Sequence, residues 1–495
     1  MSQVAAIRLI KSMSKSEKRH FKLSTKKQSG NKDYLDLFDI IDQTRFPDIQ
    51  SIEEIFKKIH PKASLDNAAR YLLKVLTDCL IQLKLKEDNS FKLFHGLMRV
   101  NILQERNLPE EGYRELKKLQ QLANISQNHF IQSIIYRSEL NYLSGINFPG
   151  LSEKNLVEMQ MKARDTLKTI RNTHEHYSLY ELLKYRLTHS GKVLSEEGKQ
   201  QLNDLLLSEM GLVTGRIKNN FESQKVHLLF QSFFFTDIAD YKSALKTFYE
   251  LNRLFEQNPS IWNYPPLDYL SSLDGILDSL RTIGSYEDMP FYIDKMGQLA
   301  EQHYPEYFQF IVEKSRVIYQ LTIFTARKKY KDAVQFIQNV DPILLKLQAL
   351  VDYDKQSELL FYFGLSYFGV KDFNKAQKYI NEIVLIGKIN YQSLIYKASR
   401  LLNIIIHYER NNLEYLDYEI RSYKRSFQLK SKLMRTEKII FKVIKLHPCM
   451  NNLKKNKQLW VKIEPDAAAI QKNKYEMQLQ KYFDFIGWIK NKLGN

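Results

Sequence analysis

Five segments in the second half of the chain share one arrangement of small and large apolar residues. In the clearest of them, SYFGVKDFNKAQKYINEIV at 366–384, Phe373, Ala376 and Ile380 recur at helical spacing after a short polar link. We call the residue that corresponds to Ala376 in each segment its anchor. The anchors are Ala244, Met289, Ala333, Ala376 and Leu416, which are separated by 45, 44, 43 and 40 residues. This nearly constant spacing predicts one structural unit that recurs along the chain.

Each unit is expected to be a helical hairpin. In the clearest unit one helix carries Leu360, Phe363, Gly364 and Tyr367 on one face, and the next carries Phe373, Ala376, Ile380 and Ile383. Small side chains let two helix backbones approach closely, so we expect the helices to cross at Gly364 and Ala376. One hairpin cannot bury its apolar face alone, and neighbouring hairpins must therefore stack and share a core.

This arrangement resembles the tetratricopeptide repeat (TPR), a pair of helices of about 34 residues. The resemblance implies an all-α fold, namely a right-handed α-solenoid of stacked helical hairpins with a period of about 40–45 residues. Longer helices or longer links must absorb the surplus length, and the proline-marked segment 258–269 is one such link.

The order of motifs over the whole chain carries a second resemblance. It runs from SKSEKRHFK through QERNLPEEGYRELKKLQQLA and the hairpin units to a closing FDFIGWIKNKL. In this the chain resembles a family of TPR-like helical proteins of Bacteroidota-type bacteria. The resemblance implies the helical-repeat fold and transfers no functional residues.

Composition favours long helices with short connections. Gly (17) and Pro (12) are scarce among 495 residues, whereas a β-rich chain needs both for its turns. The 44% of hydrophobic residues excludes extensive disorder. The two cysteines, Cys79 and Cys449, match no metal or redox spacing, and no apolar run reaches the roughly 18 residues of a membrane span. Since the N-terminus also lacks an apolar leader, we expect a soluble, cytoplasmic protein.

The chain divides into four regions by pattern. Residues 1–89 are expected to be a basic helical capping region, and residues 90–220 irregular helical hairpins. Residues 221–430 are expected to be the TPR-like repeats, and residues 431–495 basic capping helices.

Each end of the chain carries a local helix signal. Ser14 and Glu17 have the spacing of a capping box, so a helix should begin there. Near the other end, one apolar stripe beside Trp488 is formed by Tyr482, Phe485, Ile486, Ile489 and Leu493. We expect this stripe to cover the last open face of the core, with docking to a partner or a membrane surface as alternatives.

Positive charge is concentrated at the two ends. Residues 1–32 hold nine Lys or Arg against one acidic residue, and residues 421–495 hold 18 against five. Such ends can bind nucleic acid, anionic lipid or an acidic partner. Alternatively, they are helix faces in contact with solvent.

Segment 52–83 has the pattern of a helix-turn-helix, in which Asn67, Arg70 and Lys74 would face a DNA major groove. Any helical hairpin gives the same pattern.

No catalytic motif stands out. The chain has no glycine-rich phosphate-binding loop, no GxSxG and no HExxH. His174 and His176 flank Glu175, but a metal site needs at least one further ligand and usually a better-separated pair. We therefore expect a protein that is not an enzyme and that holds no cofactor or metal.

The leading expectation is an interaction scaffold for a protein or peptide partner. In a TPR-like register the first helix of each unit lines the inner face of the array, where a partner would lie. The candidate partner-binding residues are Phe233, Asp237, Asp274, Asp278, Arg281, Thr322, Glu358, Phe361, Leu365 and Glu409. The second hypothesis is a nucleic-acid-associated regulator whose basic ends hold phosphates. The identity of the partner and the oligomeric state stay open.

Overall fold

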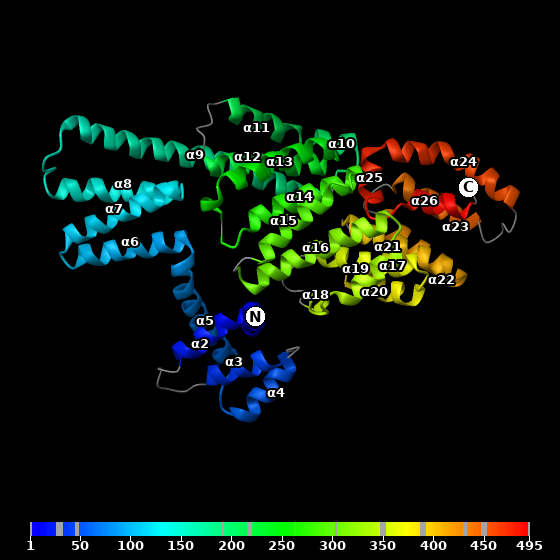
Figure 1. Cartoon of the computed structure of the whole chain (residues 1–495), viewed down its shortest axis with the longest axis horizontal. Helices are drawn as coiled ribbons and strands as arrows, with labels where there is room; N and C mark the ends of the chain where they lie inside the picture. The colour runs from blue at the N-terminus through cyan, green and yellow to red at the C-terminus, as the bar shows by residue number, and fades with distance from the viewer. Residues whose placement is uncertain are drawn as a thin grey trace.

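The computed structural model describes residues 2–25, 33–44, 49–190, 193–214, 220–262, 264–301, 304–346, 353–386, 393–428, 433–446 and 453–493. All regular secondary structure in these ranges is helical, which confirms the predicted all-α class (Figure 1). Among the described residues, no helix combines the length and the apolar character needed to cross a membrane.

The first five helices pack around a core of their own. They are α1 (Ser2–Ser12), α2 (Lys15–Thr25), α3 (Asp33–Gln43), α4 (Ile49–Ile59) and α5 (Leu65–Glu87). Phe21, Phe38 and Phe56 are fully buried in this core, and α5 leads out of the group into the rest of the molecule (Figure 1). The predicted capping box is confirmed: the Ser14 N–H donates to Glu17 Oε2 at 2.7 Å, and the Glu17 N–H donates to Ser14 Oγ at 3.2 Å.

The apolar stripe of α4 is wider than the surface that covers it. Helical spacing predicts that Ile52, Ile55, Phe56 and Ile59 share one buried face. The structure buries Ile52 and Phe56 but leaves Ile55 40% and Ile59 53% exposed. The reason is that α4 lies at the edge of the group, where α3 and α5 cover only one side of it.

The next helices follow one another as neighbours in a row (Figure 1). They are α6 (Asn89–Glu105), α7 (Pro109–Ile125), α8 (His129–Gly145) and the long α9 (Glu153–Ser190). Each of the three links turns at a residue with left-handed backbone, namely Asn107, Gln127 and Asn147. The second half of α9 packs against α12 (Phe221–Asp237), and α11 (Asn203–Thr214) packs on α9 after the short α10 (Glu196–Gln200).

The central region consists of successive helix pairs. After α12 come α13 (Tyr241–Gln257), α14 (Leu267–Ile283), α15 (Met289–Glu301), α16 (Glu306–Ala326), α17 (Tyr330–Asn339), α18 (Ile343–Lys346), α19 (Tyr353–Gly369), α20 (Phe373–Ile386), α21 (Leu394–Glu409) and α22 (Leu413–Gln428), with a 3₁₀ turn at Pro259–Ile261. The five predicted anchor residues lie on the second helix of each pair, and each is at most 3% exposed.

The same turn joins the two helices of every pair. One residue of the link adopts left-handed backbone, and these residues are Ala239, Gly284, Lys328, Lys371 and Asn411. In the fourth link the Lys371 N–H donates to the Phe368 carbonyl and the Asp372 N–H donates to the Tyr367 carbonyl, both at 2.9 Å. This pattern ends a helix and satisfies its last carbonyls. The five turn residues are separated by the same intervals as the five anchors.

The predicted close crossing of α19 and α20 is present. A Cβ atom added to Gly364 would lie 2.8 Å from Ile380 Cδ1 and 3.3 Å from the Ala376 carbonyl oxygen. Ala376 itself is fully buried. The two backbones therefore approach as closely as their small side chains allow.

Replacing Ala376 with Leu should lower the free energy of unfolding by about 1–3 kcal/mol, because the larger side chain must push the two helices apart. Urea unfolding followed by circular dichroism measures the change. Asn374→Leu is the matched control, since Asn374 is exposed on the same helix. An Ala376→Leu variant as stable as the control would contradict this crossing.

The chain ends by folding back onto the central helices. The last elements are α23 (Arg435–Leu446), α24 (Leu453–Lys472), α25 (Lys474–Gln480) and α26 (Phe485–Lys492). We call residues 474–493 the C-terminal segment. Its predicted apolar stripe is buried. Helix α25 packs against α14 and α21, and α26 packs against α23 (Figure 1). The C-terminal segment thus packs on helices of the central region as well as on α23.

Candidate functional site

Eight of the ten predicted partner-binding residues lie together beneath the C-terminal segment. Asp274, Asp278 and Arg281 come from α14, Thr322 from α16, Glu358, Phe361 and Leu365 from α19, and Glu409 from α21. We call these eight residues the inner face. Four helices that are far apart in sequence thus present one continuous surface, and the segment that touches it belongs to the chain itself.

Arg281 is the centre of the inner face. Its side chain is 1% exposed, and its guanidinium donates to Glu358 Oε1 at 3.0 Å and to the Tyr362 hydroxyl at 3.2 Å. It also pairs with Asp278, one turn earlier on the same helix. A buried arginine and its two carboxylate partners stabilise one another. Removing one of the three therefore leaves another charge without a partner.

Two lysines complete the charge balance of this set. Lys481 of the C-terminal segment contacts both carboxylate oxygens of Asp278, at 2.9 and 3.1 Å. Lys355 of α19 pairs with Asp274, whose Oδ1 also accepts a hydrogen bond from Tyr319 at 2.9 Å. Three cations therefore face three carboxylates among the described residues of this network, so the buried cluster is close to neutral.

The pairing keeps the buried carboxylates ionised. Burial raises the pKa of Asp278, but Lys481 and Arg281 lower it by more, so the pKa ends well below its usual range. Burial likewise raises the pKa of Glu358, and Arg281 with Lys355 again outweighs it, which leaves a lowered pKa. Both groups are therefore charged hydrogen-bond acceptors at neutral pH.

Aromatic residues of the C-terminal segment make the remaining contacts. The ring of Tyr482 has its centre 5.3 Å from Arg281 Cζ and 6.0 Å from the ring of Phe361. Trp488 donates from Nε1 to Glu409 Oε1 at 2.9 Å, and Lys492 donates to Glu409 Oε2 at 2.6 Å. A cation over an aromatic ring is attracted more strongly when water is excluded, as it is here.

The fit between segment and inner face is incomplete at one place. Thr322 and Leu365 line a cavity of about 300 Å³, together with Tyr482 and Phe483 of the segment. The inner face therefore has room for a side chain larger than those that the segment supplies.

The two remaining predicted residues, Phe233 and Asp237, belong to α12. Burial raises the pKa of Tyr241, and Asp278 and Asp237 both add to this, so Asp237 lies near the inner face. Phe233 packs on Tyr180 at a ring distance of 5.8 Å, and Asp237 is buried near the end of α12. The residues of the helix-turn-helix alternative, Asn67, Arg70 and Lys74, are exposed together on α5.

Sequence reasoning did not name Lys355, Tyr319 or Tyr362 as members of the site. It did not connect Lys481 with this surface either, and it placed Tyr482 in the stripe expected to cover the last open face of the core. The only local signal for Lys355 is its position three residues before Glu358 on the same helix. The distance in sequence explains the omission for Lys481, which meets Asp278 across 203 positions.

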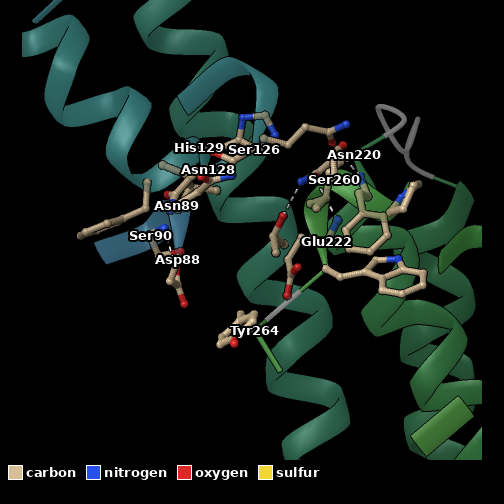
Figure 2. Close-up of a pocket in the computed structure, with 18 of the residues that line it drawn as sticks. Asp88, Asn89, Ser90, Ser126, Asn128, His129, Asn220, Glu222, Ser260 and Tyr264 are labelled. Atoms are coloured by element: carbon tan, nitrogen blue, oxygen red, sulfur yellow. Dashed lines mark hydrogen bonds between the residues drawn. The ribbon is translucent and has the colours of Figure 1, made fainter. Parts of the chain in front are cut away.

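A second candidate site is a polar cavity of about 790 Å³ (Figure 2). It lies where residues 88–90 and 126–129 face residues 220–222, residues 260–262 and Tyr264. The N-termini of α6, α8 and α12 open on it, and each is capped by a side chain of its own, from Asp88, Asn128 and Asn220. Glu87, Asp88 and Glu222 also line the cavity, so acidic groups offset the positive ends of the helices.

The protonation states of the side chains in the polar cavity suit ligand binding better than catalysis. Tyr177 on its wall donates a hydrogen bond to Glu222, and burial raises the pKa of that phenol. Lys225 lies behind Glu222, and although burial lowers the lysine pKa, Glu222 and Asp268 raise it by more. Both groups therefore keep their protons at neutral pH, and neither is an activated nucleophile.

The histidines considered from sequence do not act as a pair. His174 is exposed and lines the polar cavity, whereas His176 is buried elsewhere. Among the described residues, the group that could share a metal ion is His176, Glu209 and His227.

The structure therefore defines an all-helical protein whose own C-terminal segment lies on a charged inner face. A scan against protein-family models finds no match to this chain. A search of curated proteins finds no similar one. The TPR-like and Bacteroidota-type resemblances stay predictions that rest on the quoted motifs.

Proposed function

We propose that this chain is a right-handed, TPR-like α-solenoid that serves as a non-enzymatic scaffold for protein–protein interaction in the cytoplasm. Three observations support the solenoid: successive helix pairs pack against each other, one turn recurs in all five links, and the turn and anchor intervals agree. Stacked pairs of this kind offer an extended inner surface on which a peptide or helix can lie.

The contact between the inner face and the C-terminal segment carries the proposal. The segment behaves as a built-in ligand: Lys481 reaches Asp278, Tyr482 lies over Arg281, and Trp488 binds Glu409. A partner that uses the same surface needs the same chemistry. We therefore expect a segment that presents lysines and aromatic rings from a helix and the turn before it, as Trp488 on α26 and Lys481 and Tyr482 in the preceding turn do here.

The ionisation of the site favours binding over catalysis. Asp278 and Glu358 are fixed as carboxylates by buried cations, so neither is poised to exchange a proton near neutral pH. The buried Cys79 thiol has a raised pKa, mainly because of burial, and this suits a structural thiol in a reducing compartment.

The test uses a fluorescent peptide of residues 474–493 and two full-length variants. Lys481→Glu places a carboxylate against Asp278 and should loosen the segment, so the peptide should bind this variant at least ~10-fold more tightly than it binds the parent. Fluorescence anisotropy measures the affinity.

Lys490→Glu is the matched control, because Lys490 carries the same charge on α26 and is exposed. It should bind the peptide no better than the parent does. In the double variant Asp278→Lys with Lys481→Glu, these two residues should again form an ion pair within the chain. The segment should then cover the inner face, and the peptide should no longer bind. Equal binding to all the variants would contradict the proposal.

Nucleic-acid binding is a second candidate function, favoured by the shared exposure of Asn67, Arg70 and Lys74 on α5. Arg70 itself pairs with Asp66, and several basic residues of the two ends are also paired within the chain: Lys18 with Asp42, Lys22 with Asp39, Lys474 with Glu196, Lys481 with Asp278 and Lys492 with Glu409. Binding of random duplex DNA or RNA at about 50 mM salt, lost at higher salt, would support this function. No binding at that salt concentration would remove it.

A further inference from the structure

Three helices bring two imidazoles and a carboxylate together in the interior. His176 belongs to α9, Glu209 to α11 and His227 to α12. Their ligand atoms all lie within 4.8 Å of one another. Glu209 Oε1 accepts a hydrogen bond from His227 Nδ1 and lies 3.6 Å from His176 Nδ1. The two imidazole rings are 5.9 Å apart and nearly perpendicular, so both direct nitrogen atoms toward the carboxylate from different sides.

A simple hydrogen-bonded pair accounts for only part of this cluster. His176 and Glu209 side chains are each 1% exposed. Both ring nitrogens of His176 and the Oε2 atom of Glu209 have no hydrogen-bond partner among the described residues. Buried polar atoms are nearly always satisfied in folded proteins, by protein groups, water or an ion. Three unsatisfied atoms in one cluster therefore indicate a missing ligand.

From this geometry we infer that His176, Glu209 and His227 bind a divalent transition-metal ion, with zinc as the best fit. Two imidazole nitrogens and one carboxylate oxygen are ligands that zinc prefers, whereas Ca²⁺ and Mg²⁺ prefer sets made of oxygen atoms. In a tetrahedral site with bonds of about 2.0–2.2 Å, neighbouring ligand atoms are roughly 3.3 Å apart. The ligand atoms of the cluster, all within 4.8 Å of one another, are already close to that spacing.

The burial of the site determines its role. Three protein ligands leave one coordination position, which a water molecule can fill. His176 and Glu209 are each 1% exposed and His227 is 17% exposed, so the site is largely closed to a substrate, and the ion fastens α11 to the α9–α12 pair. This role is independent of the inner face, whose charges come from α14, α16, α19 and α21.

The experiment uses tag-free, full-length protein treated with a chelator and then titrated with Zn²⁺. We expect one equivalent to bind, measured by elemental analysis after gel filtration, and we expect the melting temperature to rise with added zinc, because an ion that binds only the folded state stabilises it. Co²⁺ provides a direct readout on the parent protein, since a four-coordinate Co²⁺ site absorbs strongly in the visible range.

Three variants and one control test the assignment. His176→Ala, Glu209→Gln and His227→Ala should each weaken zinc binding by at least ~100-fold, because even the loss of a supporting contact to a ligand weakens metal binding by about 10–100-fold. His174→Ala is the matched control, an exposed histidine two positions from His176, and should bind zinc as the parent does. Glu209→Gln keeps the shape of the side chain, so it remains informative if an alanine variant fails to fold.

Two results would overturn the inference. One is a parent protein that binds neither Zn²⁺ nor Co²⁺ at micromolar concentration. The other is undiminished zinc binding by the folded Glu209→Gln variant, which would assign the ion to histidines on the surface.

Discussion

Replacing Arg281 with Met should lower the free energy of unfolding by about 3–5 kcal/mol. Met is similar in length and needs no hydrogen bonds, but it removes the cation that Asp278 and Glu358 share. The network then lacks one positive charge, and Glu358, whose side chain is only 7% exposed, loses its arginine partner, while Asp278 is 20% exposed. Urea unfolding followed by tryptophan fluorescence is a suitable measurement, since Trp488 lies on the C-terminal segment.

Two controls separate the loss of charge from the change of side chain. Arg253→Met makes the same substitution at an exposed position on α13 and should change stability by less than about 0.5 kcal/mol. Adding Glu358→Gln to Arg281→Met should recover part of the loss, because the excess negative charge is then removed. If Arg281→Met and Arg253→Met prove equally stable, the network contributes little to folding.

Lowering the pH from 7 to 4 should destabilise the region around α21 by about 3 kcal/mol through His407 alone. Burial, with a smaller effect from the nearby Arg410 charge, lowers the pKa of His407 from 6.5 to about 4. Above pH 6.5 the imidazole is neutral in both states and adds no pH dependence. Between pH 6.5 and 4 the unfolded chain binds the proton and the folded chain does not, so stability falls as the pH falls.

His407→Gln is the variant that tests this effect, because it keeps a polar side chain beside Gln377 but does not titrate. Its unfolding midpoint in urea should change less than that of the parent between pH 7 and 4.5, and hydrogen exchange in α21 should show the same difference. His174→Gln, at an exposed position, should follow the parent. Below about pH 4 both proteins should lose stability as Asp278 and Glu358, whose pKa values are lowered, take up protons. Parallel profiles of the parent and His407→Gln above pH 4.5 would show that His407 is not responsible.

Because the C-terminal segment already occupies the inner face, a partner can bind there only by displacing the segment. A segment tethered to the same chain competes at an effective concentration of about millimolar. A partner helix must therefore bind the face more tightly than the segment does, or add contacts beyond it. The cavity of about 300 Å³ beside Thr322 and Leu365 offers one such contact, since a bulkier side chain would fill it.

Local features of this molecule were accessible from the sequence because they depend on residues close together in the chain. A helix is specified by apolar residues three and four positions apart, and Ala244, Ala333 and Ala376 mark where the second helix of a pair is buried. The capping box at Ser14 and the burial of the C-terminal stripe follow from equally local patterns. The predicted inner-face register likewise placed Asp278, Arg281 and Glu358 on helices that do meet.

Only the tertiary structure decided what covers that face and which polar groups meet inside the molecule. The C-terminal segment returns to α14 across 203 positions, and His176, Glu209 and His227 come from three helices whose sequences share no motif. Such contacts depend on how whole helices pack, and a single histidine or lysine has the same local pattern whether it faces solvent or a distant carboxylate. For this reason the helices were predictable, whereas the segment that covers the inner face and the histidine–glutamate cluster were not.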